Sequence, residues 1–154
     1  MQLSLFERKF ALDNLTDKLM ATQIFVNLPI KNLDATVEFF TKLGFTFNAQ
    51  FTDEKATCMI VGENIFFMLL VEKFFQTFTK KEICDAKKST EAILTISVET
   101  KAEVDEMINK AVAAGGAITG DPQDHGWMYA RGFYDLDGHH WEIMFADMSQ
   151  LPQS

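Results

Sequence analysis

One order of secondary structure, strand, helix and three strands, occurs twice along this chain of 154 residues. In the first unit, residues 22–71, β-branched and aromatic stretches predict the strands, and the spacing of apolar residues predicts the helix. The expected strands lie at 22–29, 45–51, 57–61 and 65–71, with a helix at 33–43 that Asn32 or Asp34 caps and Gly44 ends.

The second unit, residues 91–147, repeats the order after a charged stretch at 80–90 that we expect to be irregular. Thr100 with Glu103 three residues on is a capping-box pattern, so a helix is expected to start there. Gly115-Gly116 then ends that helix. Strands are expected at 92–98, 117–119, 127–134 and 140–145, with Asp137-Gly138 as the turn between the last two.

A unit of this kind places its helix on one side of a curved sheet, so the other face needs cover from its counterpart or from a ligand. We therefore predict an α+β fold in which two βαβββ units form a cupped mixed β-sheet, within a domain spanning residues 21–148. Residues 1–20 are predicted to be an N-terminal extension, with apolar residues at the spacing of an amphipathic helix.

Charge and composition exclude several kinds of partner. The formal net charge of -8 opposes binding to nucleic acid or to an anionic membrane. Only two Cys are present, without Cys-x-x-Cys spacing, and the first residues lack a signal-peptide pattern, so a cytoplasmic location is expected. Phe occurs 15 times, against two Tyr and two Trp, which favours an apolar cavity.

Two motifs resemble a known family. Residues 26–34 (VNLPIKNLD), running into Phe39-Phe40 and Leu43-Gly44-Phe45, are similar to its opening, and residues 135–142 (DLDGHHWE) are similar to its closing strand. The family is the glyoxalase/bleomycin-resistance/extradiol dioxygenase superfamily, also called vicinal oxygen chelate, and the resemblance covers about residues 22–147. It implies the glyoxalase/bleomycin-resistance fold and leaves the activity open, since the superfamily includes isomerases, dioxygenases, transferases and sequestering proteins.

The resemblance also implies where a metal would be bound. Its ligands would lie in the first strand of each unit and in the closing strand, at Phe25, Ile93 and Glu142, with a fourth near Met68. Only Glu142 supplies a carboxylate, and a thioether is a poor ligand for hard divalent ions. No cofactor is therefore expected, although a divalent metal held by a different set that includes His140 and Glu142 remains an alternative.

Glu142 is the candidate catalytic residue. If it lies among Phe25, Met68 and Ile93, it could act as a general base or as the counter-charge of a cationic ligand. The alternative is an inherited carboxylate that a hydrogen bond holds in place.

The strand at 127–134 supplies further candidates, because alternation places Trp127, Tyr129, Arg131 and Phe133 on one face. Tyr129 and Arg131 could hold a carboxylate, phosphate or carbonyl, and Trp127 could form a flat wall for a ring. Alternatively, Arg131 pairs with an acidic residue and the aromatic side chains fill the core or a dimer interface.

Two functions follow from these residues. The first is binding of a small organic molecule in an apolar, acidic-lined pocket without the usual metal. The second is a glyoxalase-type lyase or isomerase, either metal-dependent through a non-standard ligand set or metal-free with Glu142 as base. The resemblance further implies a homodimer. The predicted binding residues are Phe25, Met68, Ile93, Trp127, Tyr129, Arg131 and His140.

Overall fold

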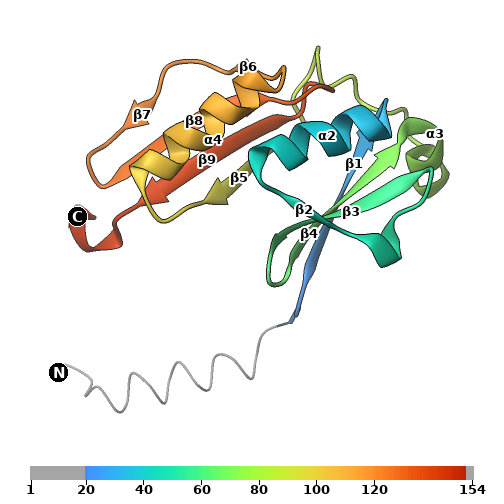
Figure 1. Cartoon of the computed structure of the whole chain (residues 1–154), viewed down its shortest axis with the longest axis horizontal. Coiled ribbons are helices and arrows are strands. Elements are labelled where there is room, and N and C mark those ends of the chain that lie inside the picture. Colours follow the sequence, from blue (N-terminus) through green and yellow to red (C-terminus); the bar gives the residue numbers. More distant parts are fainter. Residues whose placement is uncertain (1–19, 152–154) are drawn as a thin grey trace.

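The computed structural model of the chain describes residues 20–151, which form two α/β units (Figure 1). The helix expected in the N-terminal extension falls outside this range, apart from Met20. Within residues 20–151, no helix has the length and apolar character that a membrane crossing requires.

The first unit contains four strands in the order β1-β4-β3-β2. β1 (Ile24–Ile30) runs parallel to β4 (Ile65–Val71), which pairs antiparallel with β3 (Ala56–Gly62). β3 in turn pairs antiparallel with the short β2 (Thr46–Asn48). α2 (Leu33–Leu43) connects β1 to β2, as the repeat predicts.

Both ends of α2 are set by local hydrogen bonds. The Asn32 side chain accepts a hydrogen bond from the backbone N–H of Ala35 at 3.0 Å, which makes Asn32 the cap rather than Asp34. At the other end, Gly44 has a φ of 104°, a left-handed conformation that glycine adopts without the strain of a side chain.

The strand expected at 45–51 is wrong in its second half. β2 ends at Asn48, whose side chain accepts a hydrogen bond from the N–H of Gln50 at 2.9 Å. This local bond competes with strand pairing and starts the 3₁₀ helix η1 (Ala49–Phe51). The sequence also did not predict α3 (Glu72–Phe75) or the 3₁₀ helix η2 (Gln76–Phe78), both of which follow β4.

The second unit repeats the order of the first and adds one two-residue strand. Its main sheet has the order β5-β9-β8-β6, with β5 parallel to β9 and the extra β7 paired to β8. Its elements are β5 (Ile93–Ser97), α4 (Lys101–Ala113), β6 (Ala117–Ile118), β7 (Gln123–Asp124), β8 (Met128–Tyr134) and β9 (His140–Ala146).

The capping box predicted for α4 is confirmed. The N–H of Glu103 donates to the Thr100 hydroxyl at 3.2 Å, and the N–H of Thr100 donates to the Glu103 carboxylate at 3.0 Å. Each side chain therefore satisfies a backbone donor at the start of the helix. Beyond the helix, Gly115 has a φ of 106°, which turns the chain toward β6.

The core lies where α2 and α4 pack against the two sheets (Figure 1). Trp141 of β9 is fully buried at its centre. Its ring centroid lies 5.3 Å from that of Phe40 on α2 and 4.8 Å from that of Phe67 on β4. Because these contacts join β9 to the first unit, one core serves both units.

Two hydrogen bonds also link the units at the turn between β8 and β9. The N–H of Lys31 donates to the Asp137 carboxylate at 2.9 Å, and Nε2 of His139 lies 2.7 Å from the carbonyl oxygen of Pro29. The predicted α+β class with mixed sheets is confirmed. The strands are divided between two sheets, with β1 and β5 as edge strands.

Candidate functional site

The four positions that the resemblance assigns to metal ligands are divided between the two sheets. Phe25 and Met68 belong to β1 and β4, and Ile93 and Glu142 belong to β5 and β9. The Phe25 ring stacks on Phe66, with centroids 4.9 Å apart, so its neighbour is another apolar side chain. Phe25 and Ile93 are about half exposed, at 50% and 54%.

Glu142 lies on the face of the second sheet opposite to the one that packs on α4. Its neighbours in β9, Trp141 and Ile143, are buried in the core, and alternation directs Glu142 to the other side. The Thr95 hydroxyl on β5 donates to its carboxylate at 3.2 Å. Within residues 20–151, no ion pair includes Glu142. This half-buried carboxylate therefore keeps acceptor capacity for a ligand.

His140 shares this face, because it lies two residues before Glu142 on β9. Its ring packs edge-to-face with Tyr134, with centroids 5.2 Å apart. Gly132 leaves room for the His140 ring and the Thr119 side chain. A Cβ at this position would lie 3.2 Å from Nε2 of His140 and 2.3 Å from the Thr119 hydroxyl. A side chain at this position would crowd the face.

Tyr129 and Arg131 lie on the opposite face, against α4. Asp105 of α4 accepts hydrogen bonds from the Arg131 guanidinium at 2.7 Å and from the Tyr129 hydroxyl at 2.9 Å. The hydrogen bond from Arg131 holds the pKa of Asp105 below its usual value, although burial of the carboxylate opposes this shift. Burial raises the pKa of Tyr129. The arrangement matches the alternative in which Arg131 pairs with an acidic residue. A role in ligand binding stays a prediction for both residues, and for Trp127 just before β8.

A cavity of about 450 Å³ lies between the edges of β1 and β5, beneath the linker at 79–92. Of the predicted binding residues, His140 borders it; the others do not. Asn27 and His139 border it and were not predicted. One signal was available for Asn27, since Asn is uncommon inside strands. Along β1 and the start of β9, the residues that border the cavity are Val26, Asn27, Leu28, Pro29, His139 and His140.

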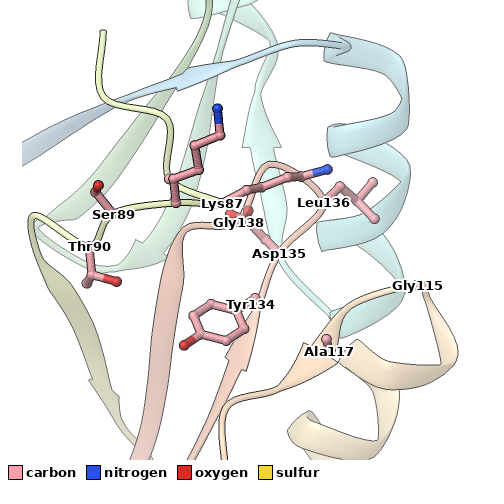
Figure 2. Close-up of a pocket in the computed structure, with 11 residues that line it drawn as sticks. Lys87, Ser89, Thr90, Gly115, Ala117, Tyr134, Asp135, Leu136 and Gly138 are labelled. Carbon is pink, nitrogen blue, oxygen red and sulfur yellow. The ribbon is translucent and has the colours of Figure 1, made fainter.

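A second cavity of about 470 Å³ lies on the other side of the linker. Figure 2 shows Ser89 and Thr90 of the linker on one side of it and the Tyr134 ring on the other. Its acidic group, Asp135, already accepts hydrogen bonds from the backbone N–H of His139 at 3.0 Å and from the Trp141 indole at 2.9 Å. Burial raises the pKa of Asp135. This carboxylate anchors the turn, so we do not place the site here.

The family positions do not fit a divalent metal. They offer two hydrocarbon side chains, one thioether and one carboxylate, whereas catalytic ions use about three N, O or S ligands. Within residues 20–151, no three or more His, Cys, Asp or Glu side chains gather where they could hold an ion. The alternative metal set consists of His140 and Glu142. The side chain that hydrogen-bonds to Glu142 there is Thr95, which offers a hydroxyl.

Comparison with known proteins places the chain in a family. The model of the Glyoxalase/Bleomycin resistance protein/Dioxygenase superfamily matches residues 22–143. The chain belongs to this superfamily. The resemblance drawn from the opening and closing motifs is thereby confirmed. No curated protein matches the chain.

Several solved structures are similar to this chain in fold. The hypothetical protein SA1046 from S. aureus is 28% identical, with a TM-score of 0.71 over 86% of this chain and 100% of that one. A glyoxalase-related enzyme from Fulvimarina pelagi is 20% identical, with a TM-score of 0.70 over 82% and 88% of the two chains. The fosfomycin resistance protein FosX from Mesorhizobium loti is 10% identical, with a TM-score of 0.60 over 86% and 97%. At the lower identities the likeness extends to the fold alone.

Proposed function

We propose that this superfamily member binds a small organic molecule without the usual metal, at the helix-free face of the second sheet beside the 450 Å³ cavity. The observation that carries the proposal is the state of Glu142. This carboxylate has one hydrogen bond from Thr95 and no cationic partner within residues 20–151. His140, about 7 Å along the same strand face, connects it to the cavity.

The surroundings of Glu142 favour a ligand with a cationic or donor group on an apolar body. The half-exposed Ile93 lies on β5 opposite His140, and the cavity wall includes Val26, Leu28 and Leu94. Such side chains provide the apolar contact of small-molecule sites, and a few polar groups then orient the ligand. The net charge of -8 would attract a cation.

We further propose that the chain acts as a homodimer. Ile24, Phe25 and Ile93 are each about half exposed. A second copy packed over these apolar side chains would remove them from water while leaving the Asn27 end of the β1 edge open.

The test of the binding function is Glu142→Gln, measured by titration calorimetry with phenethylamine and with its uncharged analogue 2-phenylethanol. We expect affinity for the amine to fall about tenfold or more, because a charge-assisted hydrogen bond is lost, and affinity for the alcohol to change little. Glu63→Gln, in the turn before β4, is the matched control and should bind the amine like the wild type.

Equal affinity of wild type and Glu142→Gln for the amine would remove Glu142 from the binding site. If the purified protein instead held stoichiometric metal, the metal-free proposal would fail. A substrate that still binds Glu142→Gln but is no longer turned over would point to the alternative, a lyase or isomerase with Glu142 as base.

A further inference from the structure

β1 directs half of its backbone groups away from its sheet. In a parallel pair, alternate residues hydrogen-bond to the neighbouring strand. The N–H of Ile24 donates to the carbonyl of Asn64 at 2.9 Å, so the even-numbered residues of β1 face β4. The N–H and C=O groups of Phe25 and Asn27, and the C=O of Pro29, therefore point to the free edge.

Side chains of the turn between β8 and β9 already occupy one end of this edge. The N–H of Lys31 donates to Asp137, and the carbonyl oxygen of Pro29 contacts Nε2 of His139 at 2.7 Å. Pro29 has no N–H, so its outward groups are fully satisfied. These two side chains take the place that a neighbouring strand would fill.

Asn27 is the next outward residue, and its position differs. Within residues 20–151, its backbone N–H and C=O make no hydrogen bond beyond its own sheet, and the residue is exposed. The four residues from Val26 to Pro29 all border the 450 Å³ cavity. Because successive side chains point to opposite faces, a cavity that meets all four must run along the edge of the strand. The free donor and acceptor of Asn27 thus open into it.

We propose that the ligand of this cavity contains a secondary amide, as a peptide-like molecule does, and pairs with the N–H and C=O of Asn27 as an added strand would. Such two-point pairing gives affinity independent of side chains. The volume suits a small molecule rather than a segment of a folded partner. This inference rests on the proposed function, because it assumes that the cavity binds a small organic molecule, and it names the chemical class.

The test uses the ¹⁵N-labelled full chain, observed by NMR, with N-acetyl-phenylalanine methylamide as the probe. We expect the Asn27 amide resonance to move in a saturable way. We also expect about tenfold weaker binding of the analogue methylated on both amide nitrogens, which cannot donate to the C=O of Asn27. Calorimetry of the same pair checks the ratio.

Two variants isolate the backbone donor. Asn27→Pro removes the outward N–H, in a strand that already accepts proline two residues on, and should weaken probe binding about tenfold. Asn27→Ala keeps the N–H and should bind like the wild type. If Asn27→Pro does not fold, as judged by circular dichroism, the methylated probe decides the question alone.

The outcomes separate this inference from the proposed function. If phenethylamine moves the His140 resonances while the probe leaves the Asn27 amide unmoved, the amide inference fails and the proposed function stands. If neither compound moves any cavity resonance, the proposed function fails. Slow hydrogen exchange of the Asn27 amide without any probe would show that this N–H is already hydrogen-bonded within the protein or its assembly, which would also overturn the amide inference.

Discussion

Asp105 gives β8 a polar attachment to α4. Its carboxylate accepts hydrogen bonds from Arg131 and Tyr129, and 45% of its side chain remains exposed. The first cause of its lowered pKa is the hydrogen bond from Arg131. A lowered pKa in the folded state means that the charged form stabilises the fold above the ordinary Asp pKa of 3.8.

We expect Asp105→Asn to lower the free energy of unfolding by about 1 kcal/mol at neutral pH, a value reduced for solvent screening. Urea unfolding at several pH values measures it. The difference from wild type should shrink as the pH falls through the lowered pKa, because protonation removes the same charge. Glu106→Gln, on the same helix in an exposed pair with Lys110, should have a smaller effect. Equal stability of wild type and Asp105→Asn at neutral pH would show that the contact contributes nothing.

Tyr129 and Arg131 show how much of the candidate site could be predicted from the sequence. Period-two alternation correctly placed Tyr129 and Arg131 on one face of β8. It carried no information on which face α4 would cover, because that depends on packing between distant elements. The roles of Asn27 and His139 depend on the free edge of β1, which follows from the division of the strands between two sheets. The same two-residue spacing also placed Glu142 and His140 together on one face of β9.

At the scale of elements, local hydrogen bonds made α2 and α4 predictable. Asn32, Gly44 and the Thr100 and Glu103 pair fix helix ends within a few residues of sequence. Five short elements were not predicted: α3, β7 and the 3₁₀ helices η1, η2 and η3 (Met148–Gln150). A single turn or a two-residue strand has too few internal bonds to form alone, so tertiary contacts decide whether it exists.

We expect Thr100→Ala to destabilise the protein by about 1 kcal/mol, because the N–H of Glu103 loses its acceptor at the start of α4. Guanidinium unfolding monitored by circular dichroism measures the change. Thr100→Ser keeps the hydroxyl and should stay close to the wild type. A loss of equal size in both variants would contradict the capping role.

At the scale of the whole molecule, Gly138 is the place where the linker meets the turn that joins the units. Its φ is 94°, and a Cβ there would lie 2.8 Å from Cγ of Lys87 and 2.9 Å from the backbone of Ala86. Gly44 has a similar φ of 104° with nothing within 4 Å of a Cβ. A comparison of the two positions therefore distinguishes backbone strain, which a side chain would suffer at both, from crowding, which it would meet only at Gly138.

We expect Gly138→Ala to lower stability by about 2–4 kcal/mol, and Gly44→Ala by about 1–2 kcal/mol, because only the former adds a clash to the left-handed strain. Thermal unfolding gives both values. Hydrogen exchange should show faster exchange in the linker at 79–92 for Gly138→Ala and not for Gly44→Ala. Equal losses of stability in the two variants would mean that the linker moves away from the added methyl group with no loss of free energy.

The two thiols of this chain differ in a way that is useful at the bench. Cys58 is 2% exposed, and burial raises the pKa of its thiol. Cys84 is exposed and borders the 450 Å³ cavity. Since the sequence has only these two Cys, a maleimide dye at neutral pH should label the native chain at one position. The protein thus carries its own attachment point for a fluorescent reporter beside the cavity, and no engineered cysteine is needed to follow what enters it.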